Sequence, residues 1–505
     1  MFRLARPLPL LAALIATLVT LALLRPVDHD ESQYVAATLL TAGEWLPYRD
    51  YAYLQTPLQP FAFAPIAWVS GWLVWPALRI INALLGALTV AAAWRAMRVA
   101  GVDPRVATAG AALFAASDIL LFSAGTARND ALPAALLAMA LVPMLRAERG
   151  EGSRGGAVLA GVLLGAAAAA KLSYALPAAV YGVYALVVRR HRPGWVALGA
   201  LPAIMLVGWL AATSPVGFVF GVLTFPAAAP AEYYEAAGRG WKLTLGARVV
   251  DLVKFLALGP GLLAMAILLL PLLKGRGWVA LRGADRLLKP THPQPLPIQG
   301  GERRLLDLLI LAGLVAAVLP SPVWRQYLLP MLVPLFVRLG IAWQARPPSR
   351  NWRIAAVVFA CAGLAPSVEA LAKGGNLGEG LAVARAIGPR EGVATLSPQL
   401  LGRAPDARFA TGPFYFRSSH LLDASQERAL RLISQARLDG LAANPPRFIL
   451  VGGEGRWSSG EDALDGVLER WAITNGYRLE QRIGTRFRLY ARSRLSVVPP
   501  SILAR

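Results

Sequence analysis

Long apolar runs, separated by short polar or basic clusters, recur from Leu8 to about Leu371. A membrane-spanning helix needs about 20 mostly apolar residues, and this part of the chain has room for many. After Lys373 the pattern becomes that of an ordinary soluble domain with short strands. The pattern therefore predicts a mainly α-helical bundle of membrane spans in residues 1–371 and a small soluble α/β domain in residues 372–505.

Basic residues gather between the apolar runs, which is the pattern of loops on the cytoplasmic side of a membrane. Placing every basic cluster on that side leaves the polar turns between them outside. This gives about eleven spans, the last over about Trp352–Ala370, and delivers the C-terminal domain to the extracytoplasmic face of a plasma (inner) membrane. The outer turns are expected at Ser123–Asp130, Lys171–Ser173, Ser214–Arg248 and Ser321–Gln326.

The first outer loop is predicted over residues 25–57, between a first span at Pro7–Leu24 and an apolar stretch at Pro57–Trp75. That stretch is long enough to cross the membrane. If it did, and Ala77–Trp94 crossed back, the arginines of residues 95–105 would lie outside, against the positive-inside rule. We therefore expect Pro57–Trp75 to be an interfacial or re-entrant helix on the outer face, and Ala77–Trp94 to be the second span.

The soluble part contains three segments with the composition of strands, at Gly392–Leu396, Arg447–Val451 and Arg486–Ala491. Asp423 is placed to cap a helix over Ser425–Leu438, which Gly440 would end. The run Gly452–Gly455 follows a predicted strand, and a simple turn is favoured over a phosphate-binding loop. Leu281–Arg304 is rich in Pro, Gln and Gly, and is expected to be a disordered cytoplasmic insertion.

Hydrophobic residues make up 56% of the chain and charged residues 16%, which excludes an ordinary soluble protein, where about a quarter of residues are charged. The net charge of +22 does not indicate nucleic-acid binding, because the Lys and Arg residues are distributed among the loops. Cys361 is the only cysteine, so no intrachain disulfide can form. The four histidines lie at no spacing typical of metal ligands.

Three carboxylates follow the first span directly, in the run Asp-His-Asp-Glu at positions 28–31. One interpretation is structural: Asp30 caps a helix over Glu31–Ala42, with Gln33 as its capping-box partner and Gly43 as its end. That interpretation needs one or two acids, not three beside a bilayer. A functional site is the favoured interpretation, and the sequence leaves both open.

Further ionisable residues lie at other predicted outer turns: Arg128 and Asp130 in one, Lys171 in another, Arg325 and Tyr327 in a third. Charged side chains at such depth are costly and by default mark a function, although a cation can also extend its charge to the interface. All of these residues fall on one membrane face. Carboxylates and cations that share a face suit a phosphate-bearing lipid and a hydroxyl group to be activated.

An ordered set of short motifs resembles the GT-C glycosyltransferases, in the branch of protein O-mannosyltransferases and bacterial aminoarabinose transferases. After the first span come Asp30-Glu31-Ser-Gln-Tyr34, Gly43-Glu-Trp-Leu-Pro47-Tyr and Thr56-Pro57-Leu58. Later in the chain come Arg128-Asn-Asp130, Gly161–Lys171 and Arg325-Gln-Tyr-Leu-Leu-Pro330. A soluble outer C-terminal domain also fits, so the likeness covers most of the chain.

Such enzymes move a sugar from a polyprenyl-phosphate carrier to a lipid, glycan or protein acceptor on the outer face. The resemblance implies that Asp30 is the general base on the acceptor, with Glu31 as its partner and Asp130 as the acid of the second loop. It also implies that Lys171 and Arg325 neutralise the departing lipid phosphate, which then needs no acid catalyst.

Asp28 is a second candidate acid, so the choice of base among Asp28, Asp30 and Glu31 stays open. Asp28, Arg128 and Tyr327 are expected to bind substrate together with Lys171 and Arg325. Some members of the family use a divalent metal and others do not, and no ligand set in the sequence decides between them. The protein is expected to contact membrane lipids and no nucleic acid.

The alternative function is a transporter or flippase of a lipid-linked sugar. Transporters place ionisable residues near the bilayer midplane and often show paired inverted halves. Here the span interiors are nearly free of charge and the acids gather at one rim, which favours an enzyme. An acyl- or phosphotransferase would need a nucleophile, for which only His29 is suitably placed.

Overall fold

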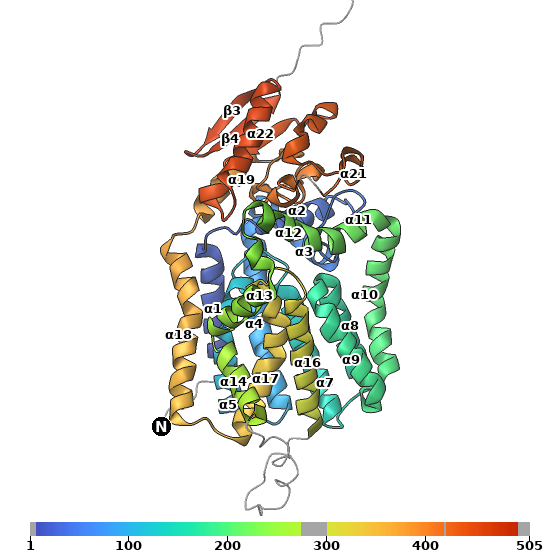
Figure 1. The fold of residues 1–505 in the computed structure, drawn as a ribbon, viewed down its shortest axis with the longest axis vertical. Coiled ribbons are helices and arrows are strands. Elements are labelled where there is room, and N and C mark those ends of the chain that lie inside the picture. The colour runs from blue at the N-terminus through green and yellow to red at the C-terminus, as the bar shows by residue number, and fades with distance from the viewer. Residues whose placement is uncertain (1–6, 274–299, 419–420, 493–505) are drawn as a thin grey trace, which may run out of the picture.

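A computed structural model describes residues 7–273, 300–418 and 421–492, and most of them are helical (Figure 1). Long helices stand side by side in a bundle, and the C-terminal part of the chain covers one end of it. The long helices are α1 (Pro7–Leu24), α4 (Val74–Val99), α7 (Ala131–Glu148), α8 (Arg154–Ala170), α9 (Ala175–Val187), α10 (Pro193–Thr213), α16 (Gly300–Val318), α17 (Leu329–Ala345) and α18 (Arg350–Ala372).

Two further passes through the bundle are broken into pairs of helices. α5 (Pro104–Ala115) is bent by 69° against α6 (Asp118–Ala124), and α13 (Leu245–Ala257) is bent by 105° against α14 (Gly261–Leu273). The two breaks meet, because the backbone N–H of Asp118 donates to the carbonyl of Leu258 at 3.1 Å. Each break thus satisfies a backbone group of the other, which a membrane interior requires of any broken helix.

Six helices of the described residues are long and apolar enough to cross a membrane, or eight if each bent pair is one span. The chain is therefore a multi-pass membrane protein. The count of eleven spans stays a prediction, because α1, α8 and α9 are apolar but shorter. The six include Pro215–Ala236, which was expected outside the membrane.

The expected interfacial stretch forms α3 (Leu58–Ser70), which a short 3-10 turn separates from α4. Gly71 takes a left-handed φ of 55° at the junction, a conformation that favours glycine. α3 packs against α2 (Glu31–Ala42) near the covered end of the bundle (Figure 1). Both its placement at the membrane surface and the second span at Ala77–Trp94 stay predictions. Residues Leu58–Val99 together form one apolar candidate span, of which α4 is the longer part.

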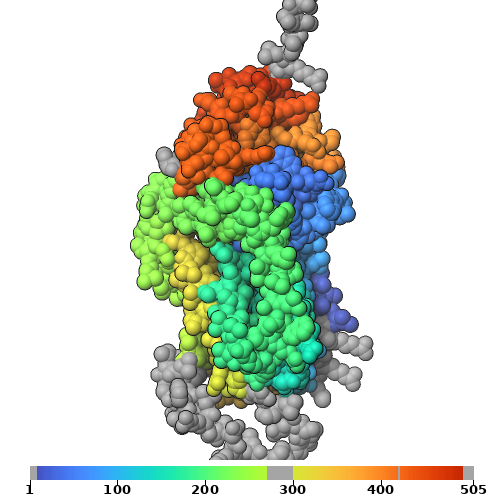
Figure 2. Space-filling model, turned by 90° about the vertical axis from the view of Figure 1, so that its right-hand side faces the viewer, coloured from blue at the N-terminus to red at the C-terminus, as the bar shows by residue number. Residues whose placement is uncertain are grey.

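Helices α8 and α10 touch through glycines. A Cβ atom on Gly161 would lie 2.0 Å from the carbonyl oxygen of Val196, and one on Gly199 would lie 2.1 Å from that of Val158. Small residues are what allow membrane helices to approach so closely. Figure 2 shows α10 running up one side of the bundle and leading into α11 (Pro215–Val219) and α12 (Phe225–Ala236), which pass beneath the C-terminal part.

The C-terminal part holds a sheet of four strands in the order β1-β2-β4-β3. β1 (Val393–Ala394) pairs in parallel with β2 (Phe448–Val451), and β4 (Phe487–Arg492) lies antiparallel to both β2 and β3 (Tyr477–Ile483). Helix α22 (Asp462–Thr474) packs apolar side chains on the sheet. The other helices of this part are α19 (Leu377–Ile387), α20 (Pro413–Phe416) and α21 (Ala424–Ala429).

Three strands were predicted and are confirmed, whereas β3 was missed. The predicted helix over Ser425–Leu438 is wrong beyond its first turns: Asp423 caps it as expected, but α21 ends at Ala429. Arg431 then takes a left-handed φ of 53°, which stops a right-handed helix. Of the predicted insertion 281–304, residues up to 299 lie outside the described residues, and residues 300–304 begin α16.

The glycine-rich run after β2 is a simple turn, as favoured. The carboxylate of Asp465 accepts hydrogen bonds from the backbone N–H groups of Gly452 at 2.8 Å and Glu454 at 3.0 Å. A phosphate loop would leave such N–H groups for a ligand. Here the Asp465 carboxylate already accepts hydrogen bonds from two of these N–H groups, so they are not available to bind a phosphate.

Glu454 provides a test of packing in this part. Burial, together with the neighbouring charge of Asp465, raises the pKa of Glu454 to about 9. A carboxyl whose pKa is raised on folding stabilises the fold below its unfolded pKa and loses that contribution as pH rises toward the folded pKa. We therefore expect Glu454→Gln to raise the free energy of unfolding by roughly 1–3 kcal/mol near pH 9, with little gain near pH 5.

Thermal unfolding in detergent across this pH range measures the difference. Glu480→Gln is a matched control, because Glu480 is a partly exposed strand residue paired with Arg390 at 2.8 Å. A stability difference between Glu454→Gln and the parent chain that is the same at all pH values would contradict the raised pKa.

Candidate functional site

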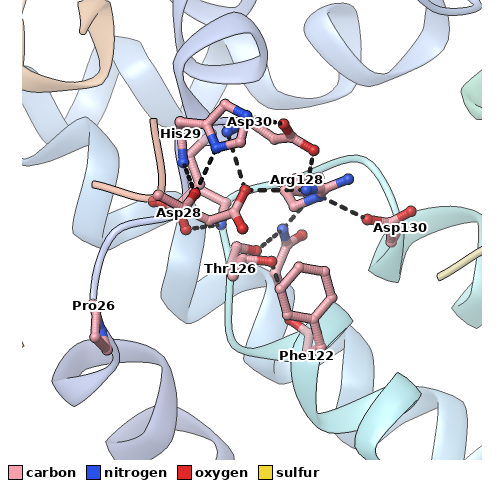
Figure 3. Close-up of polar contacts among 12 residues, drawn as sticks. Pro26, Asp28, His29, Asp30, Phe122, Thr126, Arg128 and Asp130 are labelled. Atoms are coloured by element: carbon pink, nitrogen blue, oxygen red, sulfur yellow. Dashed lines mark hydrogen bonds and ion pairs between the residues drawn. The ribbon is translucent and has the colours of Figure 1, made fainter. Parts of the chain in front are cut away.

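Two loops at the covered end of the bundle bring acids and cations together. The first follows α1 and carries Asp28 and Asp30, and the second joins α6 to α7 and carries Arg128 and Asp130 (Figure 3). The guanidinium of Arg128 lies among all three carboxylates. Its Nη1 is 3.1 Å from Asp28 Oδ1 and is also paired with Asp30, and its Nε is 3.1 Å from Asp130 Oδ2.

The second loop is held from below by Asn82 of α4. The Asn82 Nδ2 amide donates to the carbonyls of Thr126 and Arg128, both at 2.7 Å. In the first loop, Asp28 Oδ1 accepts a hydrogen bond from the backbone N–H of Asp30 at 3.0 Å, which closes a tight turn before α2. Both loops are thus fixed by side chains, and the charged groups they carry are pre-positioned.

The structural interpretation of Asp30 as a helix cap is wrong. Asp30 does occupy the position before α2, and Gly43 does end that helix, but the Asp30 side chain makes no capping hydrogen bond. Gln33 therefore has no capping box to complete. The carboxylate of Asp30 faces Arg128 and lies 3.2 Å from His29 Nε2.

Glu31 points away from the other acids and into the protein. Its carboxylate accepts hydrogen bonds from Arg79 of α4 at 3.0 Å, from the indole of Trp75 at 2.6 Å and from the backbone N–H of Ala127 at 2.9 Å. Both oxygen atoms are thereby occupied, and the Glu31 and Arg79 side chains are fully buried. The geometry gives Glu31 a positioning role; its predicted role as partner of the base has no support in these contacts.

Arg79 completes this buried clamp. It donates to the carbonyls of Ala22, Arg25 and Pro26, where α1 ends, at 2.8–3.0 Å. One ion pair thus joins the end of α1, the start of α2, the middle of the second loop and helix α4. Arg79 lies within the predicted second span, so the expectation that span interiors are nearly free of charge is wrong at this position.

Lys171 follows α8 and is paired with Asp130. Its ammonium also lies 5.4 Å from the ring centroid of Tyr327, a cation–π contact. Burial raises the pKa of Asp130, but the charges of Lys171 and Arg128 outweigh burial and leave that pKa below its usual value. Asp130 is therefore an ionised carboxylate held between two cations.

Arg325 is held by an acid that the sequence did not indicate. Its Nη1 lies 2.8 Å from Asp118 Oδ2, at the start of α6, and its side chain is 25% exposed, the most accessible of the cations at this site. Arg325 also covers the ring of Phe122 at 3.6 Å from the centroid. Arg25 and Arg128 contact the same ring at 5.1 and 5.3 Å.

Arg25 has no ion pair with any described residue, although it is buried. Burial and the nearby charge of Arg325 lower its pKa to about 10, so it stays protonated at neutral pH. A positive charge without an acid, beside two further guanidinium groups, is an environment that favours an anion.

The structure thus brings Asp28, Asp30, Arg128, Asp130, Lys171 and Tyr327 into one connected group, with Arg325 at its side. Sequence reasoning missed Arg79, Asn82 and Asp118, and used Arg25 only to mark the end of the first span. A polar residue inside an apolar helix is the available signal for the first two. Asp118 carries the same signal, as an acid within the apolar run 111–122, but no break between α5 and α6 was predicted there.

The first loop also touches the C-terminal part of the chain. His29 Nδ1 lies 2.5 Å from Ser459 Oγ, and the His29 ring stacks on Phe414 with centroids 5.3 Å apart. Beside this contact is a cleft of about 300 Å³ lined by residues of α12 and the C-terminal part, among them Glu232, Arg417 and Glu461. The site is therefore bordered by polar groups from two distant parts of the sequence.

Asp28, His29 and Asp30 also have the geometry of a metal site, since one ligand atom from each lies within 4.8 Å of the others. Carboxylate oxygen and imidazole nitrogen suit a divalent ion. However, Arg128 already pairs with both carboxylates. An ion bound there would have to displace the guanidinium from both carboxylates.

Comparison with known proteins identifies the fold. No protein-family model matches the chain, and no curated protein sequence matches it. Among solved structures, ArnT from Cupriavidus metallidurans in the apo state matches with a TM-score of 0.55 at 17% identity, over 96% of this chain and 97% of that one. The same protein bound to undecaprenyl phosphate matches with a TM-score of 0.53 at 16% identity over the same shares.

The chain has the fold of ArnT. The fold that the sequence motifs implied is confirmed, and it extends over nearly the whole of both chains. The Saccharomyces cerevisiae Pmt1-Pmt2 complex matches with a TM-score of only 0.31 at 19% identity, over 48% of this chain and 36% of that one.

The buried clamp within this ArnT-like fold gives a prediction about Glu31. Removing one partner of a buried ion pair leaves the other charge uncompensated and costs about 3–5 kcal/mol. We expect Glu31→Ala to lower the free energy of unfolding by that amount, because Arg79 is then buried without its acid. Thermal unfolding in detergent measures this loss of stability. If the loss is large enough, no folded protein will be obtained on expression.

Glu369→Ala serves as the control, since Glu369 forms an exposed pair with Lys373 at 2.7 Å, and such pairs contribute about 1 kcal/mol or less. A Glu31→Ala protein of unchanged stability that has lost its activity would assign Glu31 a catalytic role instead.

Proposed function

We propose that the chain is an integral membrane glycosyltransferase that moves a sugar from a polyprenyl-phosphate carrier to a lipid, glycan or protein acceptor on the extracytoplasmic face. The observation that carries the proposal is the group of three carboxylates around Arg128, with Lys171, Arg325 and Arg25 beside it. Such a group can both accept a proton and hold a phosphate. The ArnT fold, seen in one structure with undecaprenyl phosphate, supports it.

In the proposed reaction the acceptor hydroxyl attacks the anomeric carbon of the sugar while its proton passes to Asp30. The new glycosidic C–O bond forms as the bond between the sugar and the phosphate oxygen breaks. The polyprenyl phosphate leaves with one more negative charge than it had as a diester. Lys171 and Arg325 neutralise that charge, so the leaving group needs no protonation.

Asp30 is the preferred base among the three acids of the first loop. Glu31 is fully occupied by the clamp, and Asp28 accepts the backbone N–H of Asp30 as well as pairing with Arg128. Burial raises the pKa of Asp28, but Arg128 and His29 outweigh burial and lower the pKa below its usual value, which makes Asp28 a weak base. Asp28 and Asp130 are assigned to holding Arg128 and Lys171 in place.

The acceptor side of the site is proposed to be the cleft that contains Glu232, Arg417 and Glu461. It lies against the first loop through the contact of Phe414 with both His29 and Arg417. Carboxylates, a guanidinium and an aromatic ring suit a ligand rich in hydroxyl groups. An acceptor held in this cleft would lie beside the first loop, which carries Asp30.

The rival function is a transporter or flippase of the same lipid-linked sugar. The interior charge Arg79 does not favour it, because its guanidinium is fully committed to Glu31 and three carbonyls. A substrate pathway would need such a charge to be available. The other charges of the site lie where the helices end, at the covered end of the bundle.

Asp30→Asn tests the base. Asparagine keeps the size of the side chain but cannot accept a proton, and a positioned base contributes about 10²–10⁴-fold in rate. We expect transfer of sugar from a polyprenyl-phosphate donor to fall by at least about 10²-fold, with the protein still folded. The measurement is an in-membrane assay with a panel of radiolabelled polyprenyl-phosphate sugars.

Asp50→Asn is the matched control, because Asp50 lies in the same loop and is also ion-paired, with Arg49 at 2.6 Å, but belongs to no part of the site. Asp28→Asn and Glu31→Gln in the same assay show which acid carries the role. If all three single variants kept most of the activity, a transporter would become the leading function.

Arg325→Ala and Lys171→Ala test the donor site. Loss of a charged hydrogen bond to a bound phosphate costs about 1.5–3 kcal/mol, which is roughly tenfold or more in affinity. We expect the apparent affinity for the lipid donor to fall by that factor. The Arg325 variant is the easier to interpret, because loss of Lys171 also removes a partner of the buried Asp130. Titration of the donor in the transfer assay measures it.

Arg338→Ala is the control for these variants. It removes another arginine, one that is paired with Asp307 at 3.0 Å and lies in α17 about three helical turns beyond the site residue Tyr327. Unchanged donor affinity in both site variants would reduce Lys171 and Arg325 to interfacial anchors.

The orientation of the chain is proposed to place the site and the C-terminal domain, residues 372–505, outside the cytoplasm. A reporter that is active only outside should then be active when fused after Ala370 and inactive when fused after Gly283. Fusions tested in both reporter types, one active outside and one inside, provide internal controls. A cytoplasmic C-terminal domain would mean that Pro57–Trp75 crosses the membrane as a separate span.

A further inference from the structure

A second cleft lies at the end of the bundle away from the site. It has a volume of about 490 Å³ and is formed by α4, α7 and the beginning of α8. Asp130 precedes α7 at the site and Arg146 lies in its last turn, so the two ends of this 18-residue helix, about 27 Å apart, separate site and cleft. The cleft therefore cannot hold the phosphate on which the site would act.

Two arginines from different helices line this second cleft. Arg95 of α4 and Arg146 of α7 are exposed, and neither forms an ion pair with any residue that the structure describes. Their neighbours at the same end are paired: Arg149 with Glu302 at 3.3 Å, and Arg190 with Glu148. The cleft thus keeps two positive charges that no residue in the described part of the chain neutralises.

One acid also lines the cleft. Glu151 is 4.0 Å from Arg149, so its charge is shared with a third arginine. The N-terminal turn of α8 contributes Ser153, Gly155 and Gly156, and a Cβ on Gly155 would meet nothing within 4 Å, which leaves open space before that turn. The positive end of a helix adds to the attraction for an anion that the arginines create.

The deeper wall of the cleft is apolar. It is built from Ala92 of α4, Met139 and Val142 of α7, and Leu159 and Leu163 of α8. Leu159 is 48% exposed, so this wall is open on the outside of the bundle. The lining of the cleft therefore changes along the helices. At the helix ends it carries two guanidinium groups that no described residue pairs with, and one to two turns further in it carries aliphatic side chains.

We propose that this cleft binds one anionic phospholipid, with its phosphate between Arg95 and Arg146 and an acyl chain along Met139, Leu159 and Leu163. A phosphate joined to a long apolar chain matches both halves of the cleft, and basic pockets between membrane helices are known to take such headgroups. Free phosphate would leave the apolar wall uncovered, and a zwitterionic lipid would bring its own positive charge to the arginines.

The double variant Arg95→Gln/Arg146→Gln tests the headgroup contact. Purified protein is reconstituted in nanodiscs or detergent with phosphatidylglycerol or phosphatidylcholine, and bound lipid is counted by native mass spectrometry. We expect the parent chain to retain one phosphatidylglycerol in preference to phosphatidylcholine, and the double variant to bind that lipid roughly tenfold or more weakly. Added inorganic phosphate should neither displace the lipid nor replace its effect on thermal stability.

The matched control is Arg350→Gln/Arg353→Gln, which removes the same charge from exposed arginines at the start of α18, outside the cleft. Equal loss of lipid in both double variants would mean general attraction between the protein and acidic lipid, and would overturn the proposal. So would equal retention of the two lipids by the parent chain, or full competition by inorganic phosphate.

Leu159→Trp tests the acyl-chain contact without changing charge. The larger side chain fills the apolar wall from its open side, so the variant is expected to retain less phosphatidylglycerol while eluting as folded protein in size-exclusion chromatography. Normal retention in this variant would exclude an acyl chain from the wall. The outcome is independent of the proposed transfer reaction, because none of these residues belongs to the site.

Discussion

The buried ion pair between Glu31 and Arg79 is the constraint on which the arrangement of the site depends. Neither side chain is exposed. A charge at such a place is tolerated only with a partner and with its remaining hydrogen-bonding groups satisfied. The pair meets this requirement by taking the carbonyls that end α1, an indole of α4 and a backbone N–H of the second loop. Two loops that are about 100 residues apart in sequence are thereby fixed against each other.

The charges around the site are then balanced almost one for one. Asp28 and Asp30 share Arg128, Asp130 lies between Arg128 and Lys171, and Asp118 holds Arg325. An anion that enters must compete with these carboxylates for their cations. Binding of a phosphate and release of a carboxylate are therefore coupled events. Arg25 pairs with no described acid, so its charge requires no such exchange.

Much of the fold was predictable because the length and position of hydrophobic runs predict the membrane-spanning helices directly. α1 has the bounds expected for the first span, and α7 begins immediately after Asp130. β3 was missed because four of its five middle residues are charged or polar; all five are exposed, and only Tyr477 and Ile483 at its ends are buried. The end of α21 was misplaced because a left-handed residue, Arg431, gives no signal in composition.

For the site, the sequence predicted that the acids and cations lie at one end of the bundle. It did not predict which acid pairs with which cation. Successive residues at the start of a helix point about 100° apart, and the direction of each is decided by what the neighbouring helices offer. Arg79 draws Glu31 inward, whereas Arg128 holds Asp30 at the surface of the site. Only the packing of α4 against the two loops reveals this division.

The meeting of the two broken helices has a consequence for biogenesis. The break after α5 leaves the N–H of Asp118 to be satisfied by Leu258, and the Asp118 carboxylate to be neutralised by Arg325. Both partners are synthesised more than a hundred residues later. During translation, the polar break between α5 and α6 therefore lacks its native partners. Until they are made, the translocation machinery, water or a chaperone must satisfy its polar groups. The native path of this segment is settled only when the second half of the bundle has been made.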